Sequence, residues 1–379
     1  MNEKTKLLLL SLLFLLAAQG GTGGAGGGGG RTTRNGSNPS SLTNAYIALQ
    51  AWKSAIKADP KGIFNSWVGS NVCDYNGVFC QDSLVTGIDL NHGGVEGILV
   101  KELSLLKDMT LLHLNSNGFT GTIPDSLKDL FALTELDLSN NQFAGPFPTV
   151  ILQIPNLVYL DLRFNLFSGP IPDLVFTKNL DAILLNNNKF QGQIPQSLAN
   201  SPASVINLAN NNLTGEIPIS FGYSRHGLKE ILFLNNQLSG CIPQGIGMWS
   251  DLQVFDASFN SLMGHIPDSI SCLEDIEVLN VAHNELSGEL PELVCELKSL
   301  MNLSVAYNFF SGVSEECGRL YGRNVGFDFA LNCIPGREMQ RPEPECDMVP
   351  GGSLSCLRIP SMKSISCGAL MRSWNYEIP

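Results

Sequence analysis

The sequence is dominated by a unit of about 24 residues that recurs from residue 84 to residue 312. Each copy follows the pattern LxLxxNxLxGxIP, and the asparagines of successive copies recur at a nearly constant spacing. The nine aligned asparagines are Asn117, Asn141, Asn165, Asn188, Asn211, Asn236, Asn260, Asn284 and Asn308, and Gly93 occupies the same position in an earlier copy. Ten consecutive units of this length predict a solenoid in which each unit contacts mainly its neighbours.

Apolar residues occupy fixed positions in each unit, which we number relative to the aligned asparagine. Positions −8, −5 and −3 are apolar almost throughout, as at Leu133, Leu136 and Leu138. The alternation at −5 and −3 predicts a short strand with one face turned inward, and stacked strands then form a parallel sheet. We therefore predict an α/β fold, a leucine-rich-repeat solenoid of about ten 24-residue repeats with a short parallel β-sheet on the concave face and disulfide-bonded caps.

The recurring position of the asparagine has a physical explanation. An asparagine amide carries donors and an acceptor, so an inward-turned side chain can satisfy backbone groups where the chain leaves the strand. One unit buries about five apolar side chains, worth about 10 kcal/mol, and ordering its backbone costs at least as much. No unit is therefore stable alone, and both ends of the stack need a cap.

The amino-terminal cap is predicted at residues 43–83. A helix over residues 43–57 would place Leu49, Trp52 and Ile56 on one face, with Thr43 or Asn44 as its N-cap. Cys73 and Cys80 follow this helix and lie close enough in sequence to attach the cap to the first strand.

The remaining segments point to the secretory pathway. Residues 1–20 resemble a signal peptide, because two lysines precede a twelve-residue apolar run that is too short to cross a bilayer. A Gly-rich flexible segment at 21–42, a cysteine-containing cap at 313–346 and a tail at 347–379 complete the predicted organisation. No membrane span is expected. Ten cysteines behind a leader favour disulfides, with the pairing left open, and the predicted participants are Cys73, Cys80, Cys241, Cys295, Cys317, Cys333 and Cys346.

Several phrases go beyond a generic repeat. The stretches WVGSNVCDYNGVFC, YLDLRFNLFSG and NCIPGREMQRPEPEC resemble the repeat domain of plant leucine-rich repeat extensins. Cys241 and Cys295 fall where that family places cysteines, whereas Cys272 is extra. The resemblance implies a secreted cell-wall protein that binds small basic cysteine-rich peptides of the rapid alkalinization factor type and acts in wall formation. The Ser-Pro-rich extensin region of the family has no counterpart here, which leaves wall anchoring open.

Side chains at −6, −4 and −2 are expected on the concave side of the sheet. An acidic and partly aromatic patch is predicted there over the first four repeats. Its members are Asp89, His113, Asp137 and Asp161 at −4, Glu135 and Tyr159 at −6, and Arg163 at −2. The net charge of −12 supports a cation-binding surface and argues against nucleic acid as a partner. The alternative is a plain solvated face of the sheet.

Other candidate positions carry weaker signals. The aromatic residues Phe164, Phe259 and Tyr307 at position −1 are expected to serve structural packing. Sequons at Asn35, Asn212 and Asn302 predict glycosylation of a secreted protein, and a glycan at Asn302 would obstruct the last repeats. The five histidines are scattered and common catalytic motifs are missing from the sequence, so we expect neither enzymatic activity nor a cofactor.

The leading functional hypothesis is a binding module of the plant apoplast or cell wall that recognises basic secreted peptides or another extracellular protein. Association with wall polysaccharide is a further option. The main alternative is a polygalacturonase-inhibitor-like protein, which would also be a secreted stack of about ten such repeats. A third hypothesis is a homodimer bridged through Cys356 or Cys367.

Overall fold

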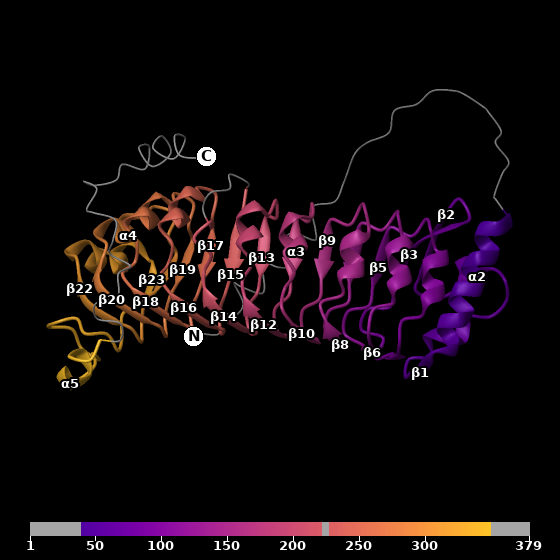
Figure 1. Ribbon diagram of the computed structural model, residues 1–379, viewed down its shortest axis with the longest axis horizontal. Helices are drawn as coiled ribbons and strands as arrows, with labels where there is room; N and C mark the ends of the chain where they lie inside the picture. The colour runs from indigo at the N-terminus through magenta and orange to yellow at the C-terminus, as the bar shows by residue number, and fades with distance from the viewer. Residues whose placement is uncertain (1–38, 222–226, 350–379) are drawn as a thin grey trace, which may run out of the picture. The chain divides into compact units, whose positions relative to one another are not determined.

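The computed structural model describes residues 39–221 and 227–349, and these form stacked turns that follow one another in sequence order (Figure 1). Each turn contributes one strand to each of two sheets, so the predicted leucine-rich-repeat solenoid is confirmed. The predicted signal peptide, the sequon at Asn35, and Cys356 and Cys367 lie outside the described residues. Most of the Gly-rich segment and of the tail also lies outside them.

The main sheet has twelve strands and contains the strand that the repeat pattern predicts. In spatial order they are β2 (Val78–Gln81), β3 (Leu84–Asp89), β5 (Leu111–His113), β7 (Glu135–Asp137), β9 (Tyr159–Asp161), β11 (Ala182–Leu184), β13 (Val205–Asn207), β15 (Glu230–Leu232), β17 (Val254–Asp256), β19 (Val278–Asn280), β21 (Asn302–Ser304) and β23 (Gly326–Asp328). Strands β3 to β23 are parallel, and equivalent positions pair, as Leu112 with Leu136 and Leu136 with Leu160. β2 pairs with β3 in the antiparallel direction.

A second sheet, which was not predicted from the sequence, consists of β1 from the cap, β4 after Gly93, and one strand after the aligned asparagine of each later turn. Its strands are β1 (Ile56–Ala58), β4 (Glu96–Gly97), β6 (Gly118–Gly121), β8 (Gln142–Pro146), β10 (Leu166–Gly169), β12 (Lys189–Gln193), β14 (Asn212–Glu216), β16 (Gln237–Gly240), β18 (Ser261–Gly264), β20 (Glu285–Leu290) and β22 (Phe309–Val313). The glycine of the Gly-x-Ile-Pro pattern has a left-handed backbone conformation, for example Gly121 at φ 85°, and the strand ends or bends at this residue.

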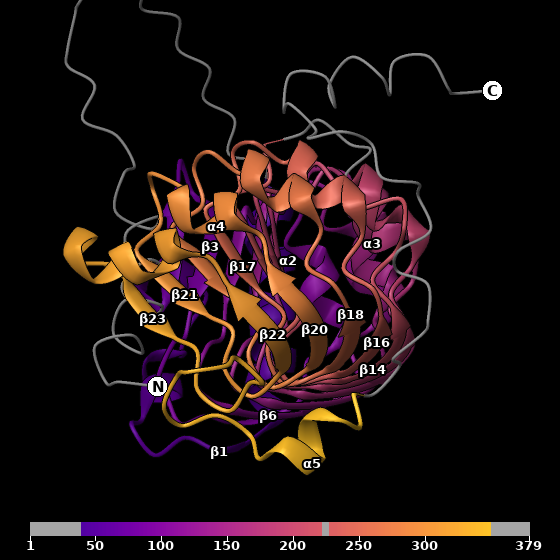
Figure 2. The ribbon, with the colours of Figure 1, turned by 90° about the vertical axis from the view of Figure 1, so that its left-hand side faces the viewer.

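Short helices complete the turns. They are η2 (Ile63–Ser66), η3 (Val72–Asp74), η4 (Lys101–Leu105), η5 (Asp125–Asp129), η6 (Thr149–Gln153), α3 (Leu174–Thr177), η7 (Gln196–Asn200), η8 (Gln244–Met248), η9 (Asp268–Cys272), α4 (Glu292–Glu296), η10 (Glu315–Arg323) and α5 (Glu343–Cys346). Seen end-on, the short helices of successive turns lie behind one another, as do the strands of each sheet (Figure 2). The core between these rows contains the predicted apolar side chains, and Leu133, Leu136 and Leu138 are completely buried.

The asparagine ladder forms as predicted. The amide nitrogen of Asn141 donates to the carbonyl oxygens of Leu114, Leu138 and Ser139 at 2.8 to 3.1 Å, and its oxygen accepts from the backbone N–H of Phe119 at 3.0 Å. The ladder also extends one turn beyond the predicted end at residue 312. Asn332, one repeat period after Asn308, makes the same set of bonds, and β23 joins the main sheet.

The amino-terminal cap differs in detail from the prediction. Helix α2 spans Pro39–Ser54, so it begins before Thr43 and ends before Ile56. Leu49 and Trp52 are fully buried as expected, but Ile56 belongs to strand β1, which pairs with β4. The helical periodicity predicted a helix that includes Ile56, but pairing with β4 at the edge of the second sheet makes Ile56 extended.

Disulfides hold both caps. Cys73 is bonded to Cys80, which joins η3 to the first strand of the main sheet. At the other end Cys295 is bonded to Cys317 and Cys333 to Cys346. Cys241 and Cys272 are disulfide-bonded as well, so every cysteine within the described ranges is oxidised.

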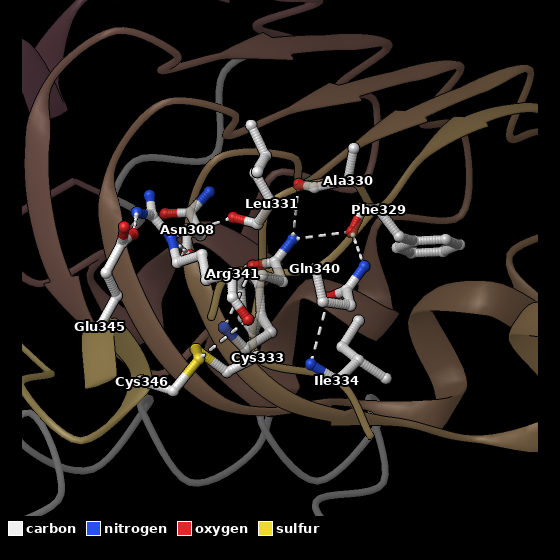
Figure 3. Close-up of a disulfide and its surroundings, with 12 residues drawn as sticks. Asn308, Phe329, Ala330, Leu331, Cys333, Ile334, Gln340, Arg341, Glu345 and Cys346 are labelled. Carbon is white, nitrogen blue, oxygen red and sulfur yellow. Dashed lines mark hydrogen bonds and ion pairs between the residues drawn. A yellow bond between two sulfur atoms is a disulfide. The ribbon is translucent and has the colours of Figure 1, made fainter. Parts of the chain in front are cut away.

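Around the last disulfide, polar side chains replace the next repeat (Figure 3). The Nε of Arg341 donates to the carbonyls of Asn308 and Leu331 at 2.8 and 3.1 Å. Gln340 accepts from the backbone N–H of Ile334 at 3.1 Å and donates to the Phe329 carbonyl at 3.2 Å. These bonds satisfy backbone groups that a following repeat would otherwise pair.

Candidate ligand-binding surface

The predicted patch residues lie on four neighbouring strands of the main sheet, β3, β5, β7 and β9. Pairing of the strands aligns Asp89, His113, Asp137 and Asp161 in one row. The same pairing places Glu135 beside Tyr159 in the adjacent row. Both rows belong to the face of the main sheet that points away from the leucine core, the face that carries positions −6, −4 and −2, and we call it the outer face. The spacing of neighbouring strands spreads the first row over about 14 Å.

The row at position −4 has a structural role that the sequence analysis did not consider. In seven residues of this row, a side-chain carboxylate or amide oxygen accepts a hydrogen bond from the backbone N–H two residues later, at 2.9 to 3.2 Å. The residues that do so are Asp89, Asp137, Asp161, Asn207, Asp256, Asn280 and Asp328. The bond closes an Asx turn where each strand ends. Aspartate in this row is therefore explained partly by the fold, and asparagine performs the same task.

His113 on β5 contacts Glu135 on the neighbouring strand β7. Its Nε2 lies 3.2 Å from the Glu135 carboxylate, and both side chains remain partly exposed. The two aspartates beside His113 in the row do not make this contact. The contact joins β5 to β7 and occupies one carboxylate oxygen of Glu135 within the protein.

Tyr159, Asp161 and Arg163 form a cluster at the end of β9. The Arg163 guanidinium lies 2.9 Å from the Asp161 carboxylate, and the Tyr159 hydroxyl donates to the same carboxylate at 3.4 Å. Burial raises the pKa of Asp161 to about 7, although the Arg163 charge opposes the shift. The Asp161 side chain has no exposed surface, which corrects its predicted role as a direct ligand contact.

The accessible acidic groups of the patch are thus Asp89, Glu135 and Asp137. Asp89 and Asp137 are half-buried, and Glu135 is exposed. Farther along the outer face, apolar side chains occupy many of the corresponding positions. They include Leu184, Val205, Leu232, Val254 and Val278. Glu230 and Asp256 on the same face are buried and Asp328 on the last strand is exposed, so accessible carboxylates are most numerous toward the amino-terminal end of the stack.

Position −1 forms a separate row beside the outer face, which we call the rim row. Phe259, His283 and Tyr307 of this row stack nearly parallel, with ring centroids 4.0 and 3.9 Å apart. Phe259 and Tyr307 stay 48% and 40% exposed, so they pack against one another and His283 rather than into the core. The two aromatic residues could be identified from the sequence but the stack could not, because its members belong to three different repeats.

Two predicted sequons fall within the described residues. Asn212 is exposed at the start of β14, in the second sheet. Asn302 lies on β21 in the main sheet, and its amide approaches Gly326 of β23. A glycan at Asn212 would therefore leave the outer face free, whereas one at Asn302 would occupy its carboxyl-terminal end. Glycosylation at either site stays a prediction.

Comparison with protein families gives matches along the repeats. A leucine rich repeat family matches residues 107–167, and a second matches residues 204–224, 251–273 and 275–297. A leucine rich repeat N-terminal domain matches residues 44–81, within the predicted cap. No helix in residues 39–221 and 227–349 is long and apolar enough to cross a membrane.

Solved structures with this fold include a plant peptide hormone receptor. The PEPR1–AtPEP1 complex aligns with a TM-score of 0.67 and 25% identity, over 76% of this chain and 45% of that chain. The plant peptide hormone receptor RGFR1 in complex with RGF2 aligns with a TM-score of 0.62 and 28% identity, over 65% and 40% of the two chains. The second of these structures shows the fold in a peptide hormone receptor.

Curated relatives are more similar in sequence. Leucine-rich repeat extensin-like protein 7 of Arabidopsis thaliana is 65% identical over 226 residues, which are 58% of this chain and 52% of the relative. Leucine-rich repeat extensin-like protein 6 of the same plant is 56% identical over 328 residues, or 84% of this chain and 69% of the relative. The chain thus spans about half to two thirds of the length of these relatives. With this identity along most of its length, the chain belongs to the plant leucine-rich repeat extensin-like family.

Proposed function

We propose that this protein binds a basic extracellular peptide on the amino-terminal half of its outer face. The observation that carries the proposal is the alignment of Asp89, Glu135 and Asp137 on neighbouring strands, where no lysine or arginine of the described residues forms a salt bridge with them. A row of carboxylates held by a rigid sheet attracts a cationic partner and orients it on arrival. The plant peptide hormone receptor with the same fold supports the same class of ligand.

The family supplies the setting of the proposal. Its extensin-like members suggest a cell-wall or other extracellular location, and the disulfides of both caps suit an oxidising compartment. We place the protein in wall formation, as a binding module without catalytic activity. The extensin-like relatives favour this setting over the inhibitor alternative.

Calorimetry with two probes tests the proposal. The first probe is a small disulfide-bonded peptide of net charge about +6, and the second is an unfolded octalysine peptide. The variant Asp89→Asn, Glu135→Gln, Asp137→Asn removes three negative charges and keeps the Asx turns, since Asn207 and Asn280 already make that bond in the same row. At about 0.5 kcal/mol for each partly exposed charge, we expect roughly tenfold weaker binding of the folded peptide at low salt.

A matched control separates the patch from the overall charge. Asp108, Glu274 and Asp275 are exposed in the segments that lead into β5 and β19, away from the outer face. The variant Asp108→Asn, Glu274→Gln, Asp275→Asn has the same net charge as the patch variant and should bind with wild-type affinity. Equal losses in both variants would mean nonspecific attraction, and wild-type protein that binds neither probe at low salt would refute the proposed function.

A further inference from the structure

We infer that Phe164 is a ligand-contacting residue of the acidic patch, whose ring receives a lysine or arginine side chain of the basic partner. This inference rests on the proposed function and adds a residue that the charge pattern alone does not identify. It follows from the backbone conformation of the rim row, from the surroundings of the Phe164 ring, and from its place beside the patch.

The rim row requires a left-handed backbone in every turn. Its members have φ between 51° and 60°, and they are His92, Ser116, Asn140, Phe164, Asn187, Asn210, Asn235, Phe259, His283, Tyr307 and Leu331. Asparagine adopts this conformation at little cost, whereas a bulky side chain is strained in it. Asparagines here also bond to one another, as Asn235 to Asn210 at 2.9 Å. Asparagine is therefore the residue that stability alone would favour in this row.

Three aromatic members of the row have a compensating contact, and Phe164 does not. The rings of Phe259, His283 and Tyr307 stack on one another at centroid distances of 4.0 and 3.9 Å. In the part of the chain that the structure describes, the ring of Phe164 has neither an aromatic nor a cationic neighbour of this kind. Phe164 is 49% exposed, so burial offsets only part of its strain. Uncompensated strain of this kind is concentrated at functional sites.

The position of Phe164 relates the ring to the acidic patch. It directly follows Arg163 of the Tyr159 cluster, and its carbonyl accepts the backbone N–H of Asn141 at 3.1 Å. Asn141 closes the turn that carries Glu135 and Asp137 on β7. Phe164 therefore follows the end of β9 and is bonded to the turn that carries the two carboxylates, where a lysine or arginine side chain bound to them can extend to the exposed ring. Aromatic rings hold lysine and arginine groups through cation–π attraction and by packing against their methylene chains.

The test uses three variants of the full chain and the disulfide-bonded basic peptide described above. Phe164→Asn should bind the peptide about 3- to 10-fold more weakly, the range expected for one lost cation–π contact. The same variant should melt about 1 to 2 °C higher, because asparagine suits the left-handed backbone. Phe164→Tyr keeps a ring and should bind within about twofold of wild type. Phe259→Asn makes the same change four repeats away and should leave the affinity unchanged.

The outcomes separate this inference from the proposed function. Weaker binding of Phe164→Asn together with an unchanged or raised melting temperature supports the inference. A lowered melting temperature would show that the ring serves packing, and unchanged affinity would show that the ligand does not contact it; either result overturns the inference. If the carboxylate triple variant weakens binding and Phe164→Asn does not, the proposed function stands and the role of Phe164 is refuted. If wild-type protein binds no basic probe, both are refuted.

Discussion

Two adjacent asparagines allow a direct test of the ladder. Asn141 is buried and makes four hydrogen bonds, three as donor to carbonyls and one as acceptor from the Phe119 N–H. Asn140 precedes it in the rim row, is exposed and donates one bond to the hydroxyl of Ser116 at 2.9 Å. Asn141→Ala leaves the buried N–H of Phe119 without a partner, while the carbonyls of Leu114, Leu138 and Ser139 each keep one other donor. At about 1 to 3 kcal/mol for the orphaned N–H and about 0.5 kcal/mol for each of the three lost carbonyl bonds, we expect a loss of about 2.5 to 4.5 kcal/mol.

The control variant Asn140→Ala should lose about 1 kcal/mol, since it gives up one exposed bond and places alanine in the left-handed region. Urea denaturation followed by circular dichroism measures both variants, with equal slopes as the condition for comparing midpoints. A loss below about 1.5 kcal/mol for Asn141→Ala, or equal losses for the two variants, would refute the claim that buried amides hold successive turns together.

Three further predictions follow from single sites. Burial lowers the pKa of His283, although the charge of Asp328 opposes the shift. The unfolded chain then binds a proton at His283 more readily than the folded chain, so stability should decrease as the pH falls below about 6.5. The melting temperature of His283→Phe, measured between pH 4 and 8, should depend less on pH than that of wild type. Replacing Cys295 and Cys317 by serine opens a 22-residue link and should cost about 3 kcal/mol, measured by thermal unfolding against wild type. A Cβ at Gly247 would lie 2.0 Å from a backbone oxygen of the next turn, whereas a Cβ at Gly318 would meet nothing within 4 Å. Gly247→Ala should therefore lower the melting temperature markedly, with Gly318→Ala as the control. A near-neutral Gly247→Ala that matches Gly318→Ala would contradict this packing.

Features that repeat within one turn were predictable from sequence. The leucines at −5 and −3 and the asparagine that follows have the same neighbours in each copy, so the repeat period predicts both burial and hydrogen bonding. The extra turn at Asn332 was missed because its strand reads GFDFA and its surroundings contain cysteines and prolines. A search for an asparagine one full period after Asn308 would have found it.

The candidate site was only partly predictable. The acidic row follows from strand alternation, because parallel stacking places equivalent positions side by side. The burial of Asp161 beneath Arg163 and Tyr159 does not follow from that pattern. It depends on side-chain conformations and on bonds to backbone groups that become available only after the strand has ended.

The sequence by itself determined the period, the stacked fold, the core positions and the family, since each depends on residues that recur at fixed spacing. Only the tertiary structure decided which carboxylates stay accessible and which rim residues find a partner. Stacking brings together side chains from successive repeats, and the left-handed turn after each strand breaks the simple alternation of faces. That is why Phe259 and Tyr307 join a stack through His283, while Phe164, with the same backbone, remains half exposed beside the acidic patch.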